Sequence, residues 1–250
     1  MSSTVTTYVV AAATVACTTL FIIAYRDYRA YIAFGPHGLP DNFSGWCKQL
    51  KMSRMARKDT TVPAPYDLQV VTTTAGPNAT KCYLSNPLEV RPGPRPQVPG
   101  FTAPQRQVTA TATAEMKHQM NTYLRSLTEA NKGIIQFELS VLEGPVPAVQ
   151  LKKCLDRPPY LNPTRGEMVH VHPPDGSTHL VLSLADSKAV IEKGWGQRHR
   201  LSGGLLGWGY TLIYAPRTQA DFETWKDIIC AAVNYCCAEF GGVENPLGKE

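Results

Sequence analysis

The chain has 250 residues, of which 43% are hydrophobic and 18% charged, a composition that allows one or two domains to bury a sizeable core. The net charge of +5 is modest, and the basic residues form no continuous run with interleaved aromatic side chains, so nucleic acid is not expected as a partner. The seven cysteines include no CxxC pair and no zinc-finger spacing, which favours free thiols in a reducing compartment over a disulfide framework.

Residues 5–25 carry no charge and are mostly apolar, over about the 20 residues that cross the hydrocarbon core of a bilayer. The four residues before them include no basic side chain, whereas a cleavable signal peptide normally starts with one. We therefore expect residues 1–25 to form a membrane anchor, a single transmembrane helix in contact with membrane lipids.

Basic residues follow the anchor at once, beginning with Arg26 and Arg29. The positive-inside rule then places the rest of the chain in the cytosol, and we expect the endoplasmic reticulum as the membrane. The free thiols agree with this orientation. Asn42 and Asn78 each begin a glycosylation sequon, which favours a lumenal domain instead.

Residues 26–110 are predicted to form a basic juxtamembrane segment and a Pro-rich arm that pack on the domain. Aromatic side chains among the basic ones leave a second interpretation open, in which the juxtamembrane segment lies on an anionic membrane surface. Between residues 86 and 105 there is too much proline for a helix or a central strand: Pro87, Pro92, Pro94, Pro96, Pro99 and Pro104.

Residues 111–250 are predicted to form the folded domain. Apolar spacing and stop signals indicate helices at residues 113–131, 186–193 and 218–240, and alternating patterns indicate strands at residues 134–142, 167–172, 178–184 and 210–214. The order predicts an α+β fold, with a mostly antiparallel sheet covered by helices and preceded by the N-terminal transmembrane helix.

The turn at residues 173–176, Pro-Pro-Asp-Gly, defines a hairpin whose register can be worked out. It pairs His172 with Ser177 and His170 with His179, so that three imidazoles share one face of the sheet. Met168 is expected on the same face. Three convergent histidines can bind a transition metal or supply acid–base groups near neutral pH, although single histidines on sheets are usually ordinary polar residues. No acidic residue at a clear spacing completes a metal-ligand set.

The Gly-rich stretch at residues 193–204 offers a flat apolar wall in Trp195, a fixed charge in Arg198 and a titrating group in His199. Such a loop would suit a planar anionic substrate. In the alternative interpretation, Trp195 only attaches the loop to the core.

The blocks His170-Val171-His172 and Thr178-His179-Leu180, the stretch Lys-Gly-Trp-Gly-Gln-Arg-His at residues 193–199 and the stretch Leu-Ile-Tyr-Ala-Pro-Arg at residues 212–217 resemble the fungal luciferase family. Members of this family oxidise 3-hydroxyhispidin, a styryl-pyrone, with oxygen and emit light. The resemblance covers nearly the whole chain apart from residues 108–165, and it identifies residues 111–250 as a luciferase-like domain.

The resemblance implies an oxygenase. A base removes the enol proton of the pyrone, the electron-rich anion reacts directly with O2 as co-substrate, and a cyclic peroxide loses carbon dioxide. No flavin or metal is then required.

Chemistry suggests which residues play which part. His170, His172 or His179 would be the base, and Arg198 and His199 would stabilise the enolate and the peroxide. Trp195, Gln197, Tyr214 and Met168 would bind the small aromatic substrate. Two alternatives stay open: a non-catalytic protein that binds an aromatic or lipid ligand, and a metal-dependent enzyme built on the same three histidines.

Overall fold

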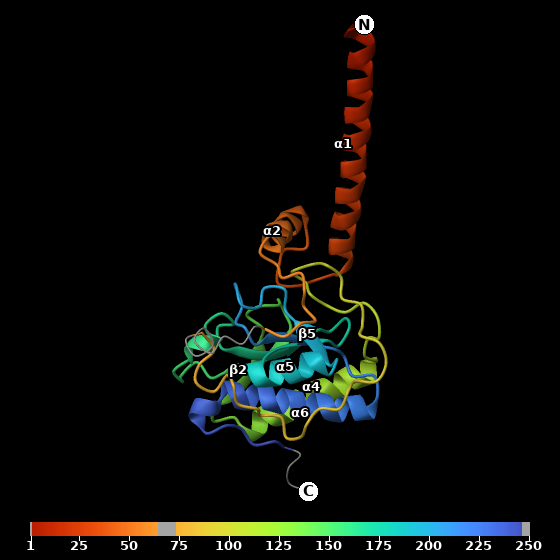
Figure 1. Ribbon diagram of the computed structural model, residues 1–250. Coiled ribbons are helices and arrows are strands. Elements are labelled where there is room, and N and C mark those ends of the chain that lie inside the picture. The colour runs from red at the N-terminus through yellow and green to blue at the C-terminus, as the bar shows by residue number, and fades with distance from the viewer. Residues whose placement is uncertain (1, 65–73, 247–250) are drawn as a thin grey trace.

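The protein consists of one long helix that stands away from a folded body, as the computed structural model shows (Figure 1). The structure describes residues 2–64 and 74–246. Residues 65–73 of the predicted juxtamembrane segment and arm, and residues 247–250 of the predicted domain, lie outside the described residues.

Helix α1 spans Ser2–Ala33, and its Thr4–Ala33 part is long and apolar enough to cross a membrane. It therefore continues eight residues beyond the predicted anchor. Its last turns contact the folded body, because Tyr31 is fully buried against Phe101, with the two ring centroids 6.1 Å apart. Asn42 caps a second, unpredicted helix, α2 (Phe43–Ser53), beside the base of α1.

The body is built on one antiparallel sheet of six strands in the order β1-β2-β3-β4-β6-β5, which confirms the predicted α+β class. Four strands were predicted, and β2 and β5 were not. The strands are β1 (Ile135–Leu139), β2 (Pro147–Leu151), β3 (Glu167–Val171), β4 (Thr178–Val181), β5 (Gly196–Arg198) and β6 (Tyr210–Ile213).

Two long helices, α4 (Ala114–Ala130) and α6 (Gln219–Cys236), cover the face of the sheet that lies away from α1 and α2 (Figure 1). Thr113 and Thr218 cap these helices through their side chains. Short α5 (Leu184–Glu192) follows β4, and single 3₁₀ turns occupy Pro159–Leu161 and Ala238–Phe240. The main hydrophobic core lies between these helices and the sheet. The histidines lie on the opposite face, toward α1 and α2.

The Pro-rich arm packs along the β5 edge. The Arg91 backbone N–H donates to the Lys193 carbonyl at 2.9 Å, and the Arg95 guanidinium donates to the Gly196 carbonyl at 2.8 Å. At the end of the arm, Arg106 donates to the carbonyls of Phe34 and Pro36, just after α1. The arm therefore connects the end of α1 to the sheet.

Candidate functional site

The hairpin between β3 and β4 has the register that the turn predicted. His170 pairs with His179, and the His172 backbone N–H donates to the Ser177 carbonyl at 2.8 Å. The rings of His170, His172 and His179 meet on one face, with centroids 4.6–5.3 Å apart. His199 joins them from the residue after β5, 4.9 Å from His179 between ring centroids. All four histidines of the sequence-based hypothesis therefore converge.

The histidines lie at a cavity of about 430 Å³. His170, His179 and His199 line it together with Tyr210, and Met52 of α2 also lines it. The other lining residues come mainly from loops and are mostly apolar: Gly38, Leu39, Ala103, Pro104, Gln105, Val141, Leu142, Glu143, Arg165, Leu201, Leu205 and Leu206.

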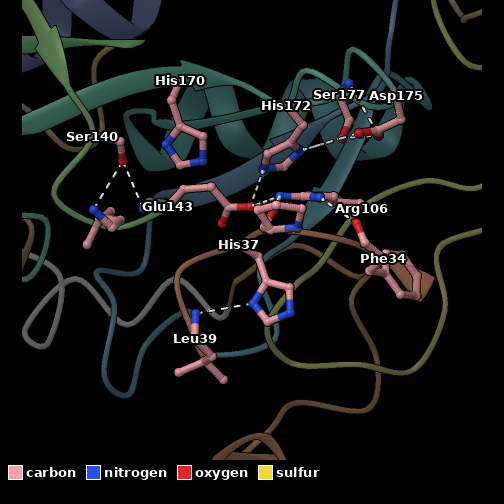
Figure 2. A network of polar contacts seen from close by, with 12 residues as sticks. Phe34, His37, Leu39, Arg106, Ser140, Glu143, His170, His172, Asp175 and Ser177 are labelled. Carbon is pink, nitrogen blue, oxygen red and sulfur yellow. Dashed lines mark hydrogen bonds and ion pairs between the residues drawn. The ribbon is translucent and has the colours of Figure 1, made fainter. Parts of the chain in front are cut away.

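Hydrogen bonds fix where two of the imidazoles carry their proton, and Figure 2 shows those of His172 with Ser177 and Asp175. His170 Nδ1 contacts a carboxylate oxygen of Glu167, which can only accept when it is ionised. His172 Nδ1 lies 2.8 Å from Ser177 Oγ, whose own hydrogen goes to Asp175. Both rings therefore hold their proton on Nδ1, and their Nε2 atoms present lone pairs.

These lone pairs face a buried space. The Nε2 atoms of His170, His172 and His179 are all buried and have no hydrogen-bond partner. Glu143 lies beside them, with Oε1 3.9 Å from His172 Nε2, and it forms a buried ion pair with Arg106. The site thus unites the ring acceptors of His170 and His172 and the unpartnered Nε2 of His179 with one carboxylate and one guanidinium. Figure 2 shows His170 and His172 beside Glu143 and Arg106.

Burial favours the neutral form of His172, His179 and His199. It lowers the pKa of His172 and His179 well below 6.5, and the neighbouring imidazoles add to the shift. Burial likewise lowers the pKa of His199 to about 3. The Leu201 backbone N–H donates to His199 Nδ1 at 3.0 Å, so the neutral His199 ring carries its proton on Nε2 and is a donor.

The prediction that Met168 lines the histidine face is wrong. Val149 pairs with Val169 but Gln150 pairs with Glu167, so Met168 has no partner on β2. This bulge interrupts the alternation of side chains between the two faces of the sheet. Met168 packs into the helix-covered core, where the Cys237 thiol lies 3.9 Å from its sulfur. Glu167 reaches the histidines instead.

Arg198 does not point at the cavity either. Successive side chains of a strand point to opposite faces, so Arg198 points away from the face that Gln197 and His199 share. Its guanidinium lies 3.4 Å from Ser202 and 5.4 Å from the Trp208 ring centroid. Burial, and then Arg57, lower its pKa to about 10. The arginine that reaches the cluster is Arg106, far along the chain from the hairpin.

Trp195, Gln197 and Tyr214 form a cluster of their own, outside the cavity. The Tyr214 hydroxyl donates to Gln197 at 3.0 Å, Trp195 Nε1 donates to the Glu89 carbonyl, and the Arg91 guanidinium lies over both aromatic rings. Gln197 shares the face of His179, but β6 separates their strands, which places them about 10 Å apart. The structure does not bring these three residues to the cavity.

Sequence reasoning missed Arg106, Glu143, Glu167 and Tyr210 as site residues. Glu143 lies in the β1–β2 loop, 27 residues before His170 in the sequence. A short-range sequence pattern therefore cannot identify it as a neighbour of the histidines. Glu167 sits three residues before His170, and only the bulge brings it to the same face.

A family model described as Luciferase domain matches residues 165–232, which include the hairpin, His199 and most of α6. The luciferase of Neonothopanus nambi is 28% identical to this chain, over 92% of this chain and 85% of that luciferase. Luciferases of Armillaria gallica and Armillaria mellea are 27% and 28% identical, over 92% and 90% of this chain and 87% and 83% of their own lengths. No solved structure matches the chain at a significant level.

Proposed function

Because this chain is a member of the fungal luciferase family, we propose that it is a membrane-anchored oxygenase that adds O2 to an enolisable hydroxy-pyrone or a related aromatic polyketide. The observation that carries the proposal is the convergence of three buried, unpartnered Nε2 atoms at one cavity.

The cavity suits a substrate of this class. A volume of about 430 Å³ falls in the range of small-molecule sites, and the lining is mainly apolar with a few polar groups at one end. An aromatic ring would lie along Leu39, Met52 and Leu206, with its oxygens toward His170 and His179.

The polar end favours the enolate. The lone pairs of the cluster promote loss of the enol proton, and the Nε2–H of His199 donates to the negative oxygen that results. In this proposal the electron-rich anion reacts directly with O2, a C–O bond forms, and the cyclic peroxide loses carbon dioxide. O2 is the co-substrate, and no flavin takes part.

The anchor places this chemistry at a membrane. We propose that α1 spans the endoplasmic reticulum membrane in contact with its lipids and that the domain faces the cytosol. Arg26 and Arg29 near the end of the apolar stretch support this orientation, as do the seven free cysteines.

The test is O2 consumption and photon counting on the full chain in lipid nanodiscs, mixed with 3-hydroxyhispidin beside an enzyme-free control. We expect O2 uptake above spontaneous oxidation, and photons would show that the product forms in an excited state. His179→Ala should lower turnover by about 100-fold or more. The matched control is His118→Ala, on the exposed face of α4, which should leave turnover unchanged.

Two outcomes would contradict the proposal. A folded His179→Ala variant with full turnover would remove the cluster from the reaction. A folded wild-type chain that binds the pyrone without consuming O2 would indicate a ligand-binding protein.

A further inference from the structure

We propose that His170, His172 and His179 bind one divalent transition-metal ion together with Glu143. Their three imidazole nitrogens and a Glu143 carboxylate oxygen all lie within 4.8 Å of one another. Metal–ligand bonds of about 2.0–2.2 Å place neighbouring ligand atoms roughly 3–4 Å apart, so the four groups need to close only slightly around an ion.

The rings are prepared as ligands by the groups behind them. Metal-binding histidines usually donate their second N–H to a carboxylate or a similar acceptor, which fixes the tautomer and the ring orientation. Glu167 plays this part for His170, and Ser177, itself bonded to Asp175, plays it for His172. Both Nε2 lone pairs are consequently held toward Glu143.

A cation satisfies this cluster better than water does. Buried polar atoms normally have a hydrogen-bond partner. The Nε2 atoms of His170, His172 and His179 have none, and these side chains are at most 3% exposed. With the Glu143 carboxylate they make four acceptors around one space. The Glu143 carboxylate already accepts from Arg106. A water molecule has two hydrogens to donate, so one water leaves at least one of the three Nε2 atoms unsatisfied, whereas one metal ion can accept from all four groups.

The donor atoms indicate the class of ion. Imidazole nitrogens favour first-row ions such as Zn²⁺, Fe²⁺, Co²⁺ and Ni²⁺, whereas Mg²⁺ and Ca²⁺ prefer oxygen ligands. Arg106 pairs with Glu143 and holds the carboxylate in place beside the rings.

The ion would be reachable from the cavity. His170, His179 and Glu143 line the cavity, while His172 lies behind its wall, so an open coordination position would face the substrate space. Two adjacent oxygens of a hydroxy-pyrone would chelate the ion there, and the ion, in place of the ring lone pairs that it occupies, would favour loss of the enol proton. This last consequence rests on the proposed function, whereas the metal site itself does not.

The first measurement is metal content. The full chain, produced without a histidine tag in metal-supplemented cells and purified in detergent, should contain about one transition-metal ion per chain by mass spectrometry. His172→Gln should retain less than about one tenth of that metal, because it replaces one ligand without reaching the cavity. His118→Gln should keep the full amount.

A second measurement does not depend on any variant folding. Metal-stripped wild-type chain is titrated with Co²⁺, and visible ligand-field absorption should appear and saturate near one equivalent. Added Zn²⁺ should raise the melting temperature of this stripped wild-type chain. Less than about 0.1 ion per chain, no Co²⁺ absorption and no thermal shift would together overturn the site.

The readouts separate the two proposals. O2 uptake by a chain that contains no metal as purified and takes up no Co²⁺ would leave the oxygenase standing and remove the metal site. A full complement of metal without O2 uptake would support the metal site and contradict the oxygenase.

Discussion

Glu167 takes the place beside His170 that simple alternation assigns to Met168. One unpaired residue in β3 is enough to exchange them, because side chains in a strand alternate with a period of two. The Glu167 carboxylate then also accepts from Ser140 Oγ and from the Val141 backbone N–H, both at 2.8 Å. The bulge therefore anchors the loop that carries Glu143 to the strand that carries His170.

Ser177 offers a test at this scale. Its hydroxyl links His172 Nδ1 to Asp175, and Ser177→Ala would leave a buried ring N–H without an acceptor. We expect the free energy of unfolding to fall by about 1–3 kcal/mol, measured by denaturant unfolding in the presence of EDTA. The control is Ser53→Ala, at an exposed position of α2, which should lower the free energy of unfolding by much less. Equal losses in the two variants would contradict the role of the Ser177 hydroxyl.

Helix α1 has two parts, a long exposed part and a last few turns that pack on the folded body. Up to residue 23 its described side chains are exposed all round, as expected of a segment that meets lipid. Beyond that, Tyr31 is buried and donates to the Pro40 carbonyl at 3.0 Å, and Asp27 accepts from Trp46 Nε1 at 2.7 Å. The last turns of α1 are thus part of the folded body.

Two truncations should distinguish these two parts. A chain without residues 2–22 should be soluble and keep its thermal transition, because the described side chains that are lost are all exposed. A chain without residues 2–33 also loses Tyr31, and removing such a buried aromatic side chain costs about 3–5 kcal/mol. Circular-dichroism melting and gel filtration would compare them, and identical melting curves would show that the last turns of α1 do not support the fold.

At the scale of the whole molecule, the cavity is assembled from segments far apart in the chain. The α1–α2 connection, the end of the Pro-rich arm, the β1–β2 loop, the hairpin and the β5–β6 region all contribute lining residues. Since α1 and α2 lie on the same side of the sheet as the histidines, the site lies between these two helices and the sheet (Figure 1). In the proposed topology, an apolar aromatic substrate dissolved in the bilayer would reach the cavity over a short distance.

The orientation across the membrane is testable on intact microsomes. In the proposed topology, added protease should digest the domain without detergent, and glycosidase treatment should leave its mobility unchanged. Asn42 supports this, because its side chain caps α2 by accepting the Gly45 N–H and is engaged in the fold. Protection from protease together with a glycosidase-sensitive shift would place the domain in the lumen.

Much of the fold follows from local sequence. An apolar stretch of sufficient length specifies α1, Thr113 and Thr218 mark the starts of the two long helices, and the turn at residues 173–176 fixes the register of the histidine hairpin. These features depend on residues within a few turns or one hairpin of each other, so their pattern can be read along the chain.

Only the tertiary structure decided the rest of the site. Strands β2 and β5 are short and gain their hydrogen bonds from distant partners, and the bulge that brings in Glu167 exists only where β2 pairs with β3. Arg106 and Glu143 reach the histidines from two separate loops, and β6 lies between the histidines and the cluster of Gln197. The sequence by itself determined that the histidines share a face; long-range packing determined their neighbours, because no local pattern records which distant loop folds over a sheet.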